Sequence, residues 1–253
     1  MKGSDSSPPL RALLLLVLLA AVALTLYLSP LSTTPPHPDT TTTSNLLKAL
    51  QQRQTSYKVL SDKVVYDRYA RVYSRQIRFP DGRQFDFDVW GRVWKNDSFA
   101  VVTVVPFDRP TKTFTLVREY NIAHARYVYS FPQGQYERSK HRSIRHGAAA
   151  ELEEEAHLQC DEWVNLLHND LGRGAPQDKY QRETVHYFLC TAAHHVQHAA
   201  DRDEEENIEV VRGVTATQLR QLVAAGALQS NNIAAALMAL HELSTLRLLP
   251  YTA

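Results

Sequence analysis

Residues 131–134 read Phe-Pro-Gln-Gly, and residues 148–158, which follow after a loop, read Ala-Ala-Ala-Glu-Leu-Glu-Glu-Glu-Ala-His-Leu. We expect the second stretch to be helical. At 3.6 residues per turn, Glu151, Glu154 and Glu155 then lie within about 100° of one another. Three carboxylates therefore share one face of the predicted helix.

The opposite face of this helix can pack on a sheet, because it carries Leu152 with Ala149 and Ala156. The shared carboxylates repel each other by a few tenths of a kcal/mol per pair, roughly, when no cation is near. A divalent cation such as Mg²⁺ would reverse that repulsion, because it prefers oxygen ligands and negative charge. A solvated acidic face is the alternative interpretation of the same pattern.

Hydrophobic patterns along the rest of the chain predict an α+β domain, with helices packed on a sheet. The run at residues 99–107 is apolar without interruption, as in a strand buried on both faces. The runs at 70–79 and 84–90 alternate and flank a Pro-Asp-Gly turn, which predicts a hairpin. Further strands are expected at 113–119, 127–131, 184–190 and 208–212, and helices at 143–159, 217–225 and 232–246.

The acidic helix and its surroundings resemble the Nudix box, G-x5-E-x7-R-E-U-x-E-E-x-G-U, where U is a bulky aliphatic residue. Residues 116–120 with 129–134 are similar to the lead-in of ADP-ribose and ADP-sugar pyrophosphatases. The acidic stretch 203–211 and the helix that starts at Asn232 are similar to later parts of the same enzymes. The box positions are matched by Gly134, Glu151, Leu152, Glu154, Glu155 and Leu158.

This resemblance implies a Nudix domain at residues 55–250, which is an α+β fold with a mixed β-sheet packed between helices, and a specific chemistry. Nudix enzymes cleave a nucleoside diphosphate linked to another moiety and use Mg²⁺ or Mn²⁺. The resemblance makes Glu151 and Glu155 the main metal ligands, with Glu154 assisting. It assigns substrate contacts to Arg118 and Gly134. One acid of the late loop would act as general base or as an extra ligand: Glu204, Glu205 or Glu206.

The chain also departs from the family pattern. Ala150 replaces the arginine that would orient a metal-binding glutamate, and His157 replaces the later glycine. Asn121 stands where a phosphate-binding arginine is frequent, and Ser130 replaces a glutamate of the lead-in. Each lost charged contact is worth about 1.5–3 kcal/mol, or one to two decades in rate or affinity. These departures favour a weak or inactive relative of the pyrophosphatases.

A membrane anchor is predicted before the domain. Residues 12–28 are apolar except for one threonine, and the uncharged stretch continues to 31, close to the ~20 residues that span a bilayer. A cleaved signal peptide is the alternative, although the sequence after Tyr27 makes a poor cleavage site. Lys2 and Arg11 precede the segment, which places the N-terminus on the cytosolic or matrix side. We therefore expect a tail at 1–11, a transmembrane helix at 12–31, and a Pro/Thr/Ser linker with a short helix at 32–54.

Composition limits the remaining functions. The net charge is +1, so we expect no nucleic-acid partner. The two cysteines, Cys160 and Cys190, are too few for a disulfide framework or zinc ribbon, and we interpret them as two small buried thiols.

Together these features predict a single-pass membrane protein that serves as an accessory subunit of a larger complex, with the mitochondrial inner membrane as one setting. The alternative is an active Mg²⁺-dependent hydrolase that releases AMP from ADP-ribose or an ADP-sugar. A homodimer is also expected, because the hairpin at 70–90 resembles strands that the family uses to pair.

Overall fold

The computed structural model describes residues 57–91, 100–168, 173–196 and 207–250. The predicted anchor at 12–31, the linker and helix at 32–54, and the acidic residues 204–206 all lie outside these ranges. Among the helices of the described ranges, none is both long enough and apolar enough to cross a membrane.

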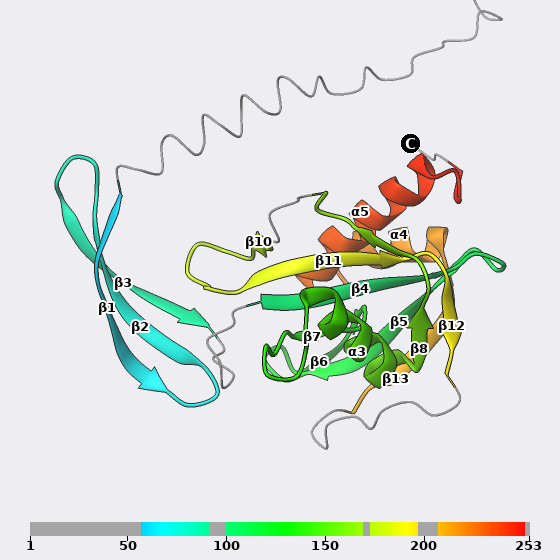
Figure 1. The fold of residues 1–253 in the computed structure, drawn as a ribbon, viewed down its shortest axis with the longest axis horizontal. Coiled ribbons are helices and arrows are strands. Elements are labelled where there is room, and N and C mark those ends of the chain that lie inside the picture. The colour runs from blue at the N-terminus through cyan, green and yellow to red at the C-terminus, as the bar shows by residue number, and fades with distance from the viewer. Residues whose placement is uncertain (1–56, 92–99, 169–172, 197–206, 251–253) are drawn as a thin grey trace, which may run out of the picture. The chain divides into compact units, whose positions relative to one another are not determined.

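The largest sheet has eight strands, and it confirms the predicted mixed architecture (Figure 1). Its path runs β10–β11–β4–β5–β13, with β6 paired to β5, β7 to β4, and β9 to β11. Only the pairing of β11 with β4 is parallel among these described pairs. The strands are β4 (Ala100–Asp108), β5 (Thr113–Asn121), β6 (Arg126–Ser130), β7 (Gln133–Gln135), β9 (Trp163–Asn165), β10 (Ala175–Pro176), β11 (Thr184–Cys190) and β13 (Glu209–Thr215).

Helices cover both faces of this sheet, because β4 sends apolar side chains to both sides. Val102 and Val104 pack with Leu152 of α3 (Ile144–Ala156) in one cluster. Phe107 packs in the other cluster, together with residues of α4 (Ala216–Ala224) and α5 (Ser230–Thr245). Figure 1 shows α3 on one side of the sheet and the pair α4 and α5 on the other. The predicted strand buried on both faces is therefore confirmed.

A separate three-stranded sheet precedes this body, in the order β1–β2–β3. It consists of β1 (Lys58–Asp67), β2 (Arg71–Arg78) and β3 (Gln84–Gly91). The predicted hairpin is β2–β3, whereas β1 was not expected, since its ten residues are all exposed and give no alternating pattern. The sheet joins the body through Trp90, whose backbone N donates to Tyr180 and whose carbonyl accepts from Arg182.

The prediction of two buried thiols is wrong, because Cys160 and Cys190 form a disulfide with Cα atoms 5.8 Å apart. Cys190 ends β11, and Cys160 ends β8 (Leu158–Cys160), which pairs with β12 (Ala193–His195) in a two-stranded sheet. The two cysteines are 30 residues apart, and nothing in the sequence between them indicated that they lie side by side in the fold.

Candidate functional site

The acidic helix α3 starts and ends at defined residues. The Ser143 side chain accepts a hydrogen bond from the backbone N of His146 and caps the first turn. The helix ends at Ala156, earlier than predicted, and His157 follows it in the left-handed conformation with φ 56°. This is the backbone geometry for which the family's glycine is suited. The backbone of the motif therefore survives the loss of its glycine.

Two of the three predicted metal ligands converge on strand β7. The backbone N of Gln133 donates to Oε2 of Glu155 at 2.9 Å, and the Glu155 side chain is buried. A Cβ atom added at Gly134 would overlap the Glu151 carboxylate. Glu151 and Glu155 thus lie against consecutive residues of one short strand, and a side chain at position 134 would displace the carboxylate of Glu151. Glu154 is half-buried on the same helix.

An amide network holds β7 in this position. The side-chain oxygen of Gln133 accepts from Asn231 at 2.9 Å and from Asn232 at 2.8 Å, and its Nε2 donates to Gln229 at 2.8 Å. Oδ1 of the fully buried Asn232 accepts from the backbone N of Phe131 at 2.7 Å. The sequence indicated Asn232 only as a helix start, and the amides clustered at 229–232 were the missed signal.

The end of α3 is held by a residue that the sequence did not single out. Nη2 of Arg212 donates to the carbonyl of Ala156 at 3.2 Å. Arg212 lies at an irregularity in β13, where Gly213 has φ 75° and the register with β5 shifts. A cation at the C-terminus of a helix is favourable because the last carbonyls are unpaired and the helix dipole is negative there.

The first stretch of the lead-in, residues 116–120, lies on β5, and side chains of this strand make contacts of their own. Arg118 pairs with Glu209 at 3.2 Å and lies over the ring of Tyr127, 4.6 Å from its centroid. Burial raises the pKa of Glu119 above its ordinary value. The Asn121 side chain accepts from the backbone N of His124 at 3.0 Å, within the turn that connects β5 to β6. Asn121 thus has a local structural contact at the position of the family's phosphate-binding arginine.

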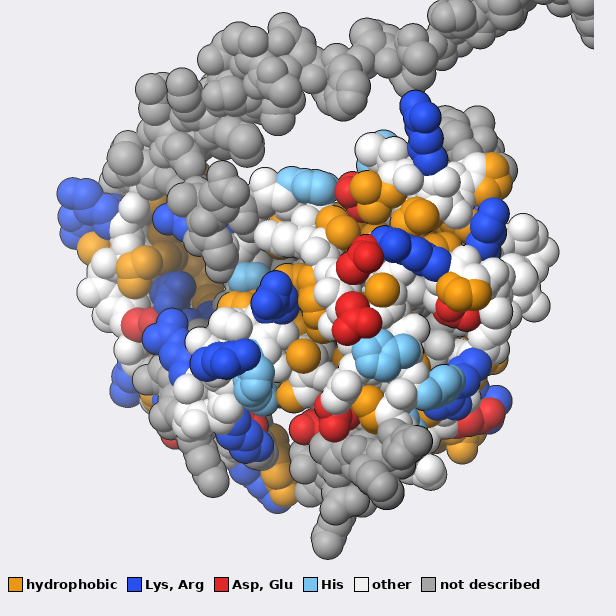
Figure 2. Space-filling model, turned by 45° about the vertical axis from the view of Figure 1, so that its right-hand side comes forward, with side chains coloured by type: hydrophobic (Ala, Val, Ile, Leu, Met, Phe, Trp, Pro, Cys, Tyr) orange, Lys and Arg blue, Asp and Glu red, His pale blue; other side chains and the backbone are white. Residues whose placement is uncertain are grey.

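The loop before α3, residues 138–143, carries basic side chains, and its Arg138 and Arg142 are exposed. Lys140 pairs with Glu137 at 2.8 Å. His141 stacks on Tyr136, and burial together with the neighbouring His146 lowers the pKa of its imidazole. The positive charge near neutral pH therefore comes from the lysine and arginines rather than from His141. Figure 2 shows a face on which acidic side chains lie next to histidines, with lysine and arginine side chains on both sides.

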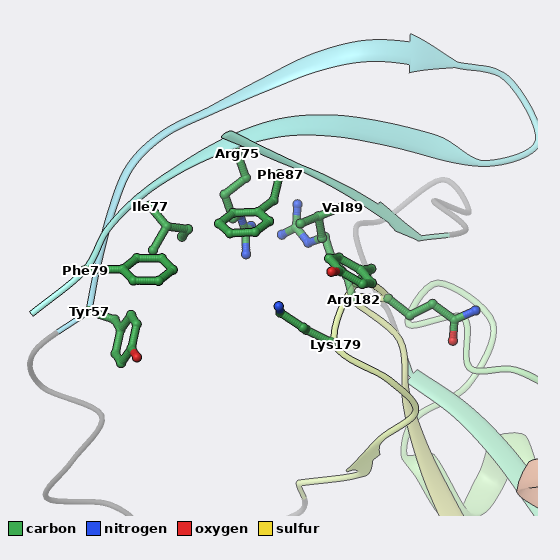
Figure 3. Close-up of a pocket in the computed structure, with 10 residues that line it drawn as sticks. Tyr57, Arg75, Ile77, Phe79, Phe87, Val89, Lys179 and Arg182 are labelled. Carbon is green, nitrogen blue, oxygen red and sulfur yellow. The ribbon is translucent and has the colours of Figure 1, made fainter. Parts of the chain in front are cut away.

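A cavity of about 480 Å³ lies between the three-stranded sheet and the segment 179–182 (Figure 3). Its apolar wall includes Phe79 and Phe87, and Lys179 lies 5.4 Å from the centroid of the Phe87 ring. The glutamates of α3 do not line it. Aromatic and cationic side chains suit a planar ring attached to an anion, but this cavity is distinct from the acidic surface of the helix.

The donor set of α3 fits Mg²⁺ or Mn²⁺ in kind, since these ions take carboxylate oxygens. Within the ranges that the structure describes, no group of three potential ligands is close enough to hold an ion. Two glutamates converge on β7, and the predicted further ligand or base belongs to the acidic stretch 204–206, outside the described residues.

We expect His157→Gly to raise the free energy of unfolding by about 1 kcal/mol, because a side chain with a Cβ is strained in the left-handed region. Ala225→Gly is the matched control. Ala225 also ends a helix, but with φ −77°, so glycine there should destabilise by roughly 0.5–1 kcal/mol. Urea denaturation of both variants measures the difference, and a destabilised His157→Gly protein would contradict the expectation.

Comparison with known proteins agrees with this geometry. The family model described as NUDIX domain matches residues 97–237. No curated protein matches the chain. A solved structure titled "Crystal structure of ADP compounds hydrolase" superimposes with a TM-score of 0.63 at 17% sequence identity, covering 77% of this chain and 97% of the other. At that identity the likeness concerns the fold, whereas the family match spans more than half of the sequence. The chain belongs to the Nudix family.

Proposed function

We propose that this protein binds nucleoside-diphosphate compounds such as ADP-ribose or an ADP-sugar, together with Mg²⁺ or Mn²⁺, and hydrolyses them slowly. The observation that carries the proposal is the convergence of Glu151 and Glu155 on Gln133 and Gly134. The solved structure with the same fold is titled as a hydrolase of ADP compounds, which supports this substrate class.

The predicted site residues would act as metal ligands and as a general base. A bound divalent ion neutralises a diphosphate and activates a water molecule. Glu151 and Glu155 would hold it, with Glu154 assisting, and one of Glu204, Glu205 and Glu206 would accept the proton of the water. Ala150 offers no charge-assisted hydrogen bond to these glutamates, and Asn121 offers no cation to a phosphate. We therefore expect substrate binding to survive better than turnover.

The test uses the full-length protein in mild detergent with Mg²⁺ and a panel of ADP-ribose and ADP-sugars. AMP release is followed by chromatography, and Mn²⁺ binding is measured separately by electron paramagnetic resonance. We expect bound Mn²⁺ and slow AMP release that chelation abolishes. Absence of both Mn²⁺ binding and turnover would overturn the proposal.

A second proposal concerns the setting of the protein. We infer that residues 12–31 anchor it in a membrane, where it serves as an accessory subunit of a larger complex, with the mitochondrial inner membrane as one candidate. Strand β1 supports a partner, because it is a sheet edge with exposed Val59, Val64, Val65 and Tyr66. Edge strands of this kind are normally covered. A second copy of the chain would cover it equally well.

Purification in mild detergent distinguishes these arrangements. An accessory subunit should co-purify with a stable membrane complex, and a homodimer should show twice the chain mass by light scattering after correction for detergent. A partner-free monomer under the same conditions would contradict both arrangements. Loss of the protein from the membrane fraction would contradict the anchor.

A further inference from the structure

The disulfide joins the segment that follows the acidic helix to the end of β11, next to the place where Trp163 of β9 pairs with Cys190. Strand β8 follows α3 after the single residue His157 and pairs only with β12 among the described strands. Cys190 instead ends β11, a central strand of the large sheet, and is fully buried. The bridge therefore adds a covalent link to hydrogen bonds that already join this segment to the main sheet, such as the one from the backbone N of Thr191 to the carbonyl of Glu162 at 3.0 Å.

Hydrogen bonds and apolar packing around the disulfide hold its two cysteines in place. Trp163 donates from Nε1 to the carbonyl of Cys160 at 3.1 Å, and its ring meets Phe188 edge to face at 5.9 Å. Cys190 belongs to the same apolar cluster as Leu152 of α3. The Cα separation of 5.8 Å lies at the usual value for a disulfide. Since the sequence holds only these two cysteines, neither has another partner in the chain.

We propose that the Cys160–Cys190 bridge is a structural disulfide formed in an oxidising compartment, so that the Nudix domain lies on the oxidising side of a membrane. Disulfides persist in secretory, extracellular and periplasmic spaces, whereas cytosolic thiols are kept reduced. The bridge forms by exchange with the disulfide of a thiol oxidoreductase. The two cysteine sulfurs become bonded to each other, and the two electrons and two protons pass to the carrier, which leaves as a dithiol.

The positive charges near the N-terminus also favour a Nudix domain that lies across the membrane from the cytosol or matrix. Lys2 and Arg11 precede the apolar segment 12–28, which favours retention of the N-terminus on the cytosolic or matrix side. The domain that follows the segment would then be across the membrane. The charge pattern and the disulfide are independent observations, and neither depends on the proposed hydrolysis.

The first test reads the thiol state of the full-length chain in eukaryotic cells. Proteins are quenched in acid, denatured, and labelled with a polyethylene-glycol maleimide before electrophoresis. We expect no labelled cysteine without reduction and two after reduction. Cys160→Ala is the control for labelling, because it leaves Cys190 as a thiol that should accept one label without reduction. Two labels on the unreduced wild type would overturn the proposal.

The second test asks whether the bridge is structural. Closing a loop of this length by a disulfide should raise the melting temperature of the purified protein by about 10 °C. A reductant should therefore lower the melting temperature of the wild type by that amount and leave Cys160→Ala/Cys190→Ala unchanged. Hydrogen exchange at residues 152–160 should also become faster on reduction. If reductant changes neither quantity in a protein shown to be reduced, the structural role is wrong. The wild type alone decides this if the double variant does not fold.

Discussion

Glu155→Gln should abolish Mg²⁺-dependent AMP release and weaken Mn²⁺ binding by about tenfold to a hundredfold, the range expected for one charged contact. This effect would come from the loss of the negative charge of Glu155. Glutamine keeps the size of the side chain, and its carbonyl oxygen can still accept the hydrogen bond from the backbone N of Gln133. What disappears is an anionic oxygen for the cation. Mn²⁺ binding and turnover should therefore both fall.

Glu153→Gln is the matched control for this prediction. Glu153 lies on the same helix, but its carboxylate accepts a hydrogen bond from Nε2 of Gln159 at 3.2 Å, beyond the end of α3. A general effect of helix charge would change both variants equally, whereas a metal site at Glu151 and Glu155 should leave the Glu153 variant close to wild type. Equal loss in the two variants would contradict the assignment of Glu155 as a ligand.

The sequence predicted the body of the fold because its signals are local. The run at 99–107 is apolar without alternation, which predicts a strand buried on both faces. The corresponding strand β4 is buried on both faces. The acidic helix, the hairpin β2–β3 and the two last helices lie within a few residues of their expected bounds. By contrast, β1 has no buried face to give it a period. An exposed edge strand of this kind is recognisable only from its pairing with β2.

The parts of the site that were missed depend on long-range contacts. The disulfide joins residues that are 30 positions apart. Arg118 was predicted to contact substrate, and the structure places it opposite Glu209 in the pairing of β5 with β13. That register cannot be read from either strand alone. The role of Arg118 toward a substrate stays a prediction, and its guanidinium would have to exchange or share this ion pair.

The backbone geometry around α3 is kept, although several positions of the Nudix motif carry other residues than the family pattern. His157 still takes the left-handed conformation after the helix, and Arg212 caps the carbonyl of Ala156 from another strand. Gly134 still leaves room for Glu151. The structure thus places the predicted ligands Glu151 and Glu155 beside β7, and the sequence lacks two cations of the family pattern, so we expect the proposed site to bind better than it turns over.

Asn232→Ala should lower the free energy of unfolding by about 3 kcal/mol, because it leaves buried polar groups without partners. The fully buried Asn232 accepts from the backbone N of Phe131 and donates to Gln133 and Asn231. Alanine removes all of these bonds in a place that water cannot easily reach. Urea denaturation of the full-length protein in mild detergent measures the change.

Asn231→Ala provides the comparison. Asn231 is only partly buried, and the hydrogen bonds of its side chain go to Gln133 and Asn232 alone among those identified. Its loss should cost about 0.5–1.5 kcal/mol for each of these two bonds, without a further penalty, because Asn232 still donates to Gln133. Because Gln133 also donates to Glu155, Asn232→Ala should weaken Mn²⁺ binding as well as stability, and Asn231→Ala should do so less. If the two variants are equally stable, the buried amide of Asn232 does not hold β7 against the helix.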